Sequence, residues 1–244
     1  MKISLAVPFL SVILPLALAP VEFALGRLKR GSGIATSCVA TLPLLCALYC
    51  LIRIHSLPGR VGWMLIGPLN TLFLFITSLI SLLVCVYSIG YVKEREWEYY
   101  PLLLVFIASM NGVVISENLL VLFLFFEVAT ISSILLVSHE RQVAVEASLK
   151  YAVMALFTGA ITLLGIGLIA WLFGTLSITE LVKVKKLSET LSLTEYTTPL
   201  IMGLVAAGFC LKTALVPLHA WAPDAYSEAP TPISALLSGA MAKC

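Results

Sequence analysis

The stretch FCLKTALVPLHAWAPDAYSEAPTPISALLSGAMAKC at residues 209–244 places charged residues and prolines inside an apolar sequence. Lys212 stands in an apolar run, Pro217 and Pro223 follow it, and Lys243 comes near the end of the stretch. A proline inside a helix removes a backbone donor and clashes with the preceding turn. The stretch therefore predicts a helix that is broken beside a lysine.

The rest of the chain is also apolar. Of its 244 residues 60% are hydrophobic and 11% are charged, whereas a soluble domain averages about 45–50% and about 25%. The net charge of +2 and the lack of a basic cluster among aromatic residues exclude a nucleic-acid-binding protein. The composition predicts an integral membrane protein, in which each spanning helix takes about 20 residues.

Short polar segments divide the apolar sequence into runs. These runs predict an all-α fold of seven to eight transmembrane helices, the seventh broken by proline. The runs cover about residues 3–25, 34–54, 64–89, 101–116, 119–138, 148–173, 199–216 and, as a partial eighth, 230–244. The polar stretch between the sixth and seventh runs fits an amphipathic helix on the surface or a plain solvated loop. The sequence shows neither the alternation of a barrel nor a glycine-rich nucleotide loop.

The first helix imitates a signal peptide, because Lys2 precedes an apolar core and a small-residue step. Pro20 at the cleavage junction and the continuation of the run to Leu25 favour a retained helix instead. Lysine and arginine in the short loops incline toward an N-terminus on the outside.

Six cysteines occur, without a CxxC pair and without a histidine at metal-ligand spacing. We interpret them as small buried apolar residues and expect no metal site. No spacing suits a flavin, haem or iron–sulfur cluster, so we expect no cofactor.

Two ionisable residues stand where the runs should lie deepest in the membrane. Glu127 is about 12 Å from the nearer end of its run, and Lys212 is about 20 Å along its run from Pro199. A charge at such depth costs at least about 2.5–3.5 kcal/mol on insertion scales. Both side chains should therefore face protein or water and have a partner.

Other candidates have ordinary explanations as well. Lys150 lies two residues into its run, where its side chain can reach the membrane surface. His219 shares a face with Lys212 if the helix continues, although a histidine near the interface also serves as a simple anchor. Lys243 is about 20 Å along a helix that starts at Pro230.

The chemistry of such residues favours a proton relay over a substrate pocket. Burial disfavours the charged forms of glutamate and lysine, whereas pairing favours them. A pair that forms and separates can therefore move a lysine between its charged and neutral states near pH 7.

Residues 212–243, KTALVPLHAWAPDAYSEAPTPISALLSGAMAK, resemble the signature of a known family. It comprises the antiporter-like subunits of respiratory complex I, the Mrp cation/proton antiporters and energy-converting membrane-bound hydrogenase or sulfur-reductase complexes. The segments YSIGYV, FFEVATISSILLV and EASLKYAV extend the resemblance to about residues 87–244. It implies the first half of an inverted-repeat fold.

The resemblance assigns roles residue by residue. Glu127 is similar to the fifth-helix glutamate, Lys212 to the lysine of the broken seventh helix, and Lys243 to the eighth-helix lysine. Lys150 resembles a sixth-helix lysine of some members, and His219 the histidine of a PxHxW segment. These five residues are the candidate proton-translocation site, with the helix break at Pro217 and Pro223.

The sequence departs from the family in two respects. Ser238 stands where many members have a histidine, and the chain ends within the last helix of the first repeat. We therefore expect three leading helices over residues 1–98 and one five-helix repeat over 99–244, with the second repeat absent. Another antiporter-like subunit near residues 230–244 would supply the missing half of the path; a truncated product or a tilted last helix is the alternative.

The functional hypothesis is a membrane subunit of a redox-driven complex that conducts protons, alone or in exchange for sodium, through a half-channel. In this hypothesis the chain is a non-catalytic subunit of an oxidoreductase complex, in a prokaryotic plasma membrane rather than the mitochondrial inner membrane. The alternatives are a non-conducting spacer and a subunit of an independent Mrp-type sodium/proton antiporter. Retention of Glu127, Lys212 and Lys243 favours conduction, because a spacer could replace buried charges with leucine.

Overall fold

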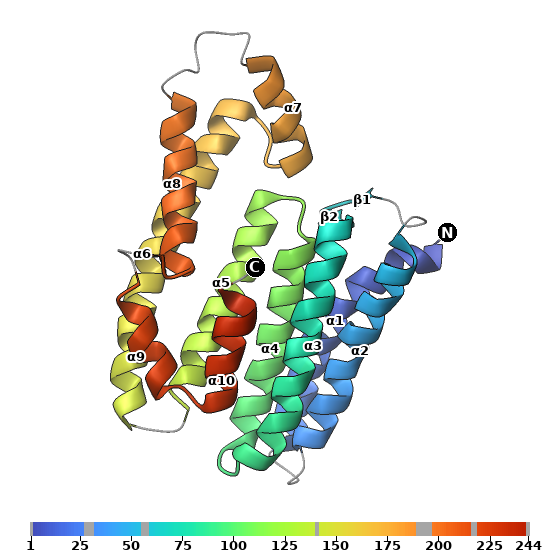
Figure 1. Ribbon diagram of the computed structural model, residues 1–244, viewed down its shortest axis with the longest axis vertical. Coiled ribbons are helices and arrows are strands. Elements are labelled where there is room, and N and C mark those ends of the chain that lie inside the picture. The colour runs from blue at the N-terminus through green and yellow to red at the C-terminus, as the bar shows by residue number, and fades with distance from the viewer. Residues whose placement is uncertain are drawn as a thin grey trace.

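The computed structural model describes residues 2–26, 32–54, 59–139, 142–188, 197–215 and 219–242, and it is built of helices with one small hairpin (Figure 1). The helices are α1 (Lys2–Gly26), α2 (Ser32–Ile52), α3 (Pro68–Tyr91), α4 (Glu96–Ile115), α5 (Leu119–Val137), α6 (Gln142–Phe173), α7 (Ile178–Ser188), α8 (Thr197–Lys212), α9 (Trp221–Glu228) and α10 (Thr231–Leu236), which continues into a π-helical turn, Leu237–Met241. In the described part of the chain, α1 to α6 are long and apolar enough to cross a membrane. The predicted all-α membrane fold is confirmed.

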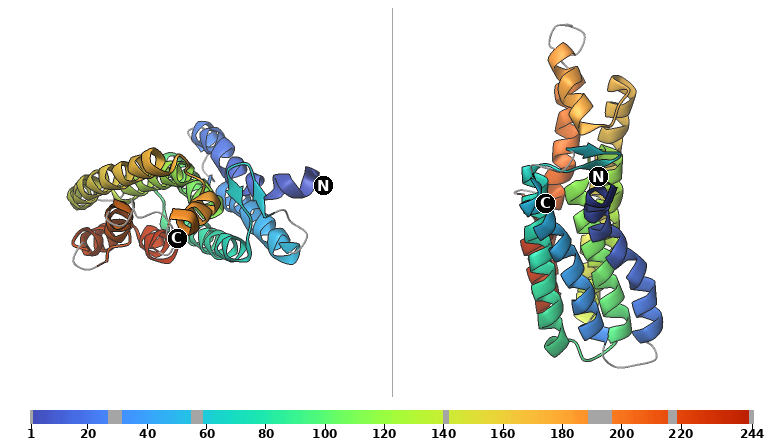
Figure 2. Two further views of the ribbon diagram at one scale, coloured as in Figure 1. Left: turned by 90° about the horizontal axis from the view of Figure 1, so that it is seen from above. Right: turned by 90° about the vertical axis from the view of Figure 1, so that its right-hand side faces the viewer.

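Helix α4 lies at the centre of the first group of helices. Of its residues 83% are buried, against 33% to 44% in the other five candidate spans. It packs against α1, α2, α3 and α5, which surround it (Figure 2). The outer helices can turn leucine and isoleucine outward, because in a membrane those side chains meet lipid instead of water.

Buried polar side chains join the first helices to one another. Asn111 of α4 donates to the Ser11 carbonyl oxygen of α1 at 3.1 Å, and its own carbonyl oxygen accepts from Thr77 of α3 at 3.2 Å. The hydroxyls of Ser88 and Tyr99 are 2.9 Å apart between α3 and α4. Hydrogen bonds between helices stabilise membrane bundles, typically by about 0.6 kcal/mol each.

The second group of helices is formed around α6 and α8, which run side by side (Figure 1). A Cβ atom added to Gly208 would collide with the side chain of Thr162, and one added to Gly165 would come 2.6 Å from Val205 Cγ2. Glycine thus permits the close approach of the two helices. α9 then packs against α6, while α10 lies against α3 and α5.

Several boundaries differ from those predicted. The third helix begins at Pro68 instead of residue 64, because Met64–Leu65 forms strand β2 and pairs with β1 (Arg60–Val61) in a hairpin that turns at Gly62, where φ is 58°. Proline at the first helical position is well placed to start α3 there. Helix α7 covers residues 178–188 of the polar stretch, so this part is a helix and not a plain loop.

The cysteines are less uniformly buried than expected. Cys50 and Cys85 are buried, Cys46 and Cys210 are half-buried, and Cys38 is exposed. Cys38 lies on the outer face of α2, where exposed apolar side chains such as Ile34 and Leu45 also lie. Cys244 is outside the described residues.

Candidate functional site

The seventh apolar run is interrupted directly after Lys212. The last turn of α8 is closed by a hydrogen bond of 3.0 Å from the Leu215 amide to the Cys210 carbonyl oxygen, and Ala214 has φ 54°. This arrangement is the Schellman motif, in which one left-handed residue ends the helix. A helical chain resumes at Trp221, so the predicted broken helix is confirmed.

The two prolines assigned to the break have different outcomes. Pro217 lies outside the described residues. Pro223 is not in the break, which corrects its assignment: it occupies the first turn of α9. Proline is tolerated there because the first backbone N–H groups of a helix have no intrahelical partner.

The break places the ammonium group of Lys212 beside the carboxylate of Glu127. Lys212 Nζ donates to Glu127 Oε1 from α8 to α5. The side chain of Lys212 is 5% exposed and that of Glu127 is 25% exposed. Since the carbonyl end of a helix carries partial negative charge, the last position of α8 also favours a cation.

Aromatic rings and a glycine complete the surroundings of the ion pair. Lys212 Nζ lies 4.4 Å from the ring centroid of Phe126 and 5.8 Å from that of Phe123, within the range of cation–π attraction. A Cβ atom on Gly159 of α6 would come 3.1 Å from Glu127 Oε1. The small residue leaves space for the carboxylate between α5 and α6.

A small, partly open cavity adjoins Lys212. Its volume of about 10 Å³ is at the lower limit for one water molecule. Its wall is almost entirely apolar, although residues with hydroxyl and ammonium groups are among those that line it. The lining residues are Thr130, Tyr151, Met154, Ala155, Thr158, Lys212, Trp221 and Met241.

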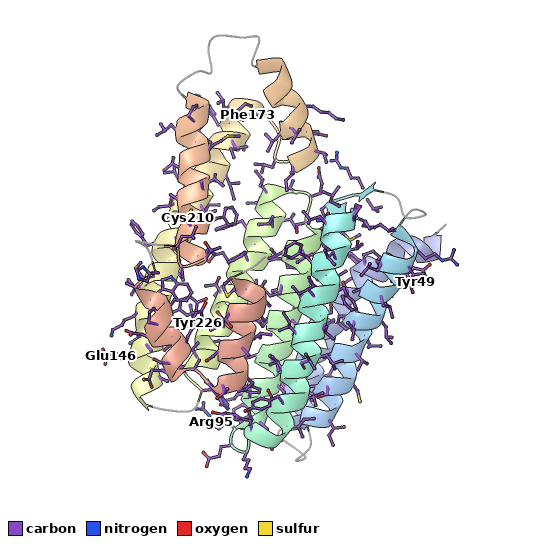
Figure 3. The ribbon with its side chains drawn as sticks, in the orientation of Figure 1. Tyr49, Arg95, Glu146, Phe173, Cys210 and Tyr226 are labelled. Atoms are coloured by element: carbon purple, nitrogen blue, oxygen red, sulfur yellow. The ribbon has the colours of Figure 1, made fainter. Side chains whose placement is uncertain are left out.

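Lys150 is placed apart from this ion pair. Its Nζ lies 3.1 Å from Asp224 Oδ2 of α9 and 3.1 Å from Glu146 Oε1 of its own helix. The side chain is 54% exposed. Figure 3 shows Glu146 near the start of α6, close to α9. Lys150 therefore ties α6 to the helix that follows the break.

The remaining predicted residues are not brought to the ion pair. His219 is exposed in the turn before α9, and its carbonyl oxygen accepts a bond of 3.0 Å from the Ala222 amide. Lys243 lies outside the described residues. Within the described ranges, no group of three histidine, cysteine or acidic side chains could hold a metal ion.

Sequence reasoning missed three residues of the site and its surroundings. Tyr151 lines the cavity, and Asp224 is the partner of Lys150. Glu22 of α1 is buried and accepts a bond of 2.9 Å from Thr36 of α2. An acidic residue within the first apolar run was a visible signal for Glu22, whereas tyrosine is ordinary in such a run.

Another buried carboxylate lies between α4 and α5. Glu117 is 2% exposed, and its Oε1 accepts bonds from the hydroxyls of Ser177 and Thr179 at 2.5 and 2.6 Å. Arg60 Nη2 of the hairpin lies 3.4 Å from the other oxygen. Burial raises the pKa of Glu117, but the bonds from Ser177 and Thr179, aided by Arg60, outweigh burial and hold the pKa below its usual value.

The part of the chain that holds the ion pair matches a known protein family. The transmembrane family described as NADH:quinone oxidoreductase/Mrp antiporter matches residues 116–244, which include Glu127 and Lys212. The fold and the buried ion pair define an antiporter-like membrane subunit. The chain belongs to the NADH:quinone oxidoreductase/Mrp antiporter family.

A relative named Na(+)/H(+) antiporter subunit A1, from Staphylococcus haemolyticus (strain JCSC1435), is 37% identical over 176 residues. The match covers 70% of this chain and 21% of that subunit. A counterpart from Staphylococcus aureus (strain JH9) is 38% identical over the same length and share. The chain thus matches about a fifth of the length of these curated relatives.

Solved structures share the fold over nearly the whole chain. A chain of the membrane-bound sulfane sulfur reductase, an archaeal respiratory membrane complex, has a TM-score of 0.85 at 26% identity, covering 97% of this chain and 51% of that one. The Mrp complex from Dietzia sp. DQ12-45-1b gives 0.83 at 24% identity, covering 100% and 47%. Respiratory complex I from Thermus thermophilus gives 0.74 at 22% identity, covering 93% and 50%. All three come from multi-subunit membrane complexes.

Proposed function

We propose that the chain conducts protons as a subunit of a larger membrane complex, through the ion pair of Glu127 and Lys212. The observation that carries this proposal is the buried ammonium group at the broken end of α8, which pairs with one carboxylate and lines one small cavity. A buried charge of this kind is costly in a membrane and typically belongs to an ion pathway.

The ion pair can control the charge of Lys212. While Glu127 is in contact, the ammonium form is favoured, because the opposite charge offsets the loss of hydration. When the two separate, burial of the Lys212 side chain favours the neutral amine, and a proton leaves toward the cavity. Return of the carboxylate draws a proton back, so a cycle of contact and separation moves protons.

The finer parts of the proposal concern the other residues. Lys150, with Asp224, would exchange protons near the start of α6, and Lys243 would continue the path. Since every candidate on this path lies within residues 99–244, that unit would be the half-channel and residues 1–98 its scaffold. His219 would act at the break.

The proposed partners are other membrane subunits, including an antiporter-like neighbour near residues 230–244. The support is that the structurally similar chains are parts of multi-subunit complexes. Redox chemistry would reside in other subunits. The proposed location is a prokaryotic plasma membrane, supported by the bacterial relatives.

A double-mutant cycle in the assembled complex tests the ion pair. Lys212→Met, Glu127→Gln and the double variant are reconstituted in vesicles, and proton movement is followed with a pH-sensitive dye. We expect each single variant to lose transport at least about tenfold, a barrier change of about 1.4 kcal/mol, and the double variant to lose little more. Independent, multiplicative losses would contradict the coupling, and full transport by Lys212→Met would support the spacer alternative.

A second candidate is sodium/proton exchange in an Mrp-type assembly. The identity of 37% to a subunit named Na(+)/H(+) antiporter favours it. The same vesicles distinguish the two: exchange requires that proton movement depend on a sodium gradient, and that Lys212→Met abolish both fluxes together. Proton movement that does not depend on sodium would contradict exchange and leave proton conduction as the remaining candidate.

A further inference from the structure

Tyr151 connects helices on both sides of the break. It follows Lys150 on α6 and is 3% exposed. Its ring stacks on that of Trp221, the first residue of α9, with centroids 4.4 Å apart and planes 8° from parallel. Two adjacent residues of α6 thus hold α9: Lys150 by an ion pair at the surface and Tyr151 by stacking in the interior. The stack fixes the ring, and therefore the position of the hydroxyl.

The hydroxyl of Tyr151 has partners on two other segments. Its oxygen lies 3.0 Å from Ser133 Oγ of α5 and 3.4 Å from Met241 Sδ in the π-helical turn. Ser133 donates its own hydrogen to the Thr130 carbonyl oxygen at 2.7 Å. A hydroxyl has one hydrogen and two lone pairs, so Ser133 accepts from Tyr151. Tyr151 keeps a lone pair for a group on another side.

Tyr151 and Lys212 line the same cavity. The two threonines of the cavity use their hydrogens within their own helices: Thr130 donates to the Phe126 carbonyl oxygen at 2.8 Å, and Thr158 to that of Met154 at 2.5 Å. They therefore offer lone pairs that can hold a water molecule in place. Unlike these threonines, Tyr151 has a hydroxyl that contacts side chains of other segments.

We propose that the Tyr151 hydroxyl passes protons between the cavity at Lys212 and the segment 231–241. This inference rests on the proposed proton conduction. The Tyr151 hydrogen first turns from Ser133 to Met241. A cavity water that has received a proton from Lys212 then gives one to the Tyr151 oxygen, and the first hydrogen leaves toward Met241. One O–H bond forms and one breaks, so the hydroxyl is neutral before and after.

The acceptor beyond Met241 is a water molecule or a neutral amine. Sulfur is a weak acceptor and does not keep the proton, so Met241 marks the direction of transfer instead of its end. The sequence supplies Lys243 as an amine shortly after Met241. Rotation of the newly formed O–H bond from the cavity side back to Ser133 resets the relay.

Tyr151→Phe in the assembled complex tests the relay, because phenylalanine keeps the ring and its stack but lacks the hydroxyl. We expect proton transport to fall at least about tenfold, within the usual range for loss of one proton-transfer group. The solvent isotope effect on transport should rise, since proton transfer becomes the slow step. A role in packing alone would leave the isotope effect unchanged.

Tyr226→Phe is the matched control. Tyr226 of α9 also contacts Trp221, with ring centroids 6.3 Å apart, but it is not among the residues that line the cavity. We expect its transport and isotope effect to equal those of the unchanged complex. Transport by Tyr151→Phe within about twofold of this control, with the same isotope effect, would overturn the relay.

Two further variants keep the outcome decisive. If Tyr151→Phe does not assemble, Ser133→Ala removes the resting acceptor of the tyrosine hydrogen: altered isotope and pH profiles support the relay, and unchanged profiles overturn it. Lys212→Met is measured in parallel. Full transport without Lys212 refutes the proposed function, whereas loss without Lys212 and normal transport without the Tyr151 hydroxyl refute the relay alone.

Discussion

Glu117, just before α5, and Glu127, in the middle of α5, differ in how many groups hold them. Glu117 accepts bonds from the hydroxyls of Ser177 and Thr179 and from the Thr179 amide, and it pairs with Arg60. Glu127 pairs with Lys212, its one hydrogen-bonding partner among the described residues. A carboxylate that accepts bonds from many donors is held ionised and in one position. A carboxylate with a single partner loses its hydrogen bond when that partner moves.

The elements around the two glutamates account for this difference. Glu117 lies outside the candidate spans, where the start of α7 brings free backbone N–H groups and short hydroxyl side chains to it. Glu127 lies inside α5, whose own backbone groups are already bonded, so donors must come from side chains of other helices. The first site joins the hairpin and α7 to the bundle; the second suits a transfer of charge.

The largest effect should come from separating the Glu127–Lys212 pair. Glu127→Leu leaves a buried ammonium group unpaired and should lower the free energy of unfolding by about 3–5 kcal/mol. Adding Lys212→Met should restore it to within about 1 kcal/mol of the unchanged protein, because an apolar pair replaces the charges. Unfolding of the purified complex in detergent measures both, and a double variant less stable than Glu127→Leu would contradict this.

A smaller, local effect is expected at Glu117. Glu117→Leu removes the common acceptor of Ser177 and Thr179, which should cost about 1–3 kcal/mol, because these hydroxyls and Arg60 can still find water. Hydrogen exchange of the α7 amides should accelerate, with little change in α8. Glu180→Leu is the control: Glu180 also pairs with Arg60 but is 48% exposed, and its loss should matter by less than about 0.5 kcal/mol. Equal exchange in both variants would show that α7 does not depend on Glu117.

The smallest effect should be that of pH on α7. The pKa of Glu117 in the folded state is lowered from 4.5, so its contribution to stability is present above that value and lost as pH falls through the lowered pKa. Exchange of the α7 amides, corrected for the intrinsic rate, should be constant from about pH 7 to 5 and accelerate below about pH 4. Glu117→Gln should abolish this dependence. Acceleration already near neutral pH would point to another group.

The sequence was sufficient to predict that Glu127 and Lys212 have partners, because a charge in a long apolar run conflicts with burial in lipid. It was insufficient for Tyr151, whose hydroxyl has meaning only beside Ser133 and the cavity. The group around Glu117 was missed for a related reason. Its members come from three loops and helix ends, where polar residues are ordinary, and nothing in the spacing indicates that they meet.

Helix boundaries show the same limit. Hydropathy predicted the membrane helices, but it counted Met64 as part of a helix, although Gly67 and Pro68 carry a start signal for α3. It placed the end of the seventh run at residue 216, because an apolar tail can continue past a helix end. The end at Lys212 depends on the left-handed conformation of Ala214, which alanine adopts at a cost and which no pattern announces.

The 32 residues of α6 have a consequence for where the ends of this helix lie relative to the membrane surface. At 1.5 Å per residue the helix is about 48 Å long, whereas the hydrocarbon layer of a bilayer is about 30 Å thick. Even a tilt of about 40°, the upper end of what membrane helices adopt, leaves it about 7 Å too long. The first turns of α6 carry its charged residues, so this end stands among the lipid headgroups, and the half-exposed Lys150 with Asp224 and Glu146 lies near that surface.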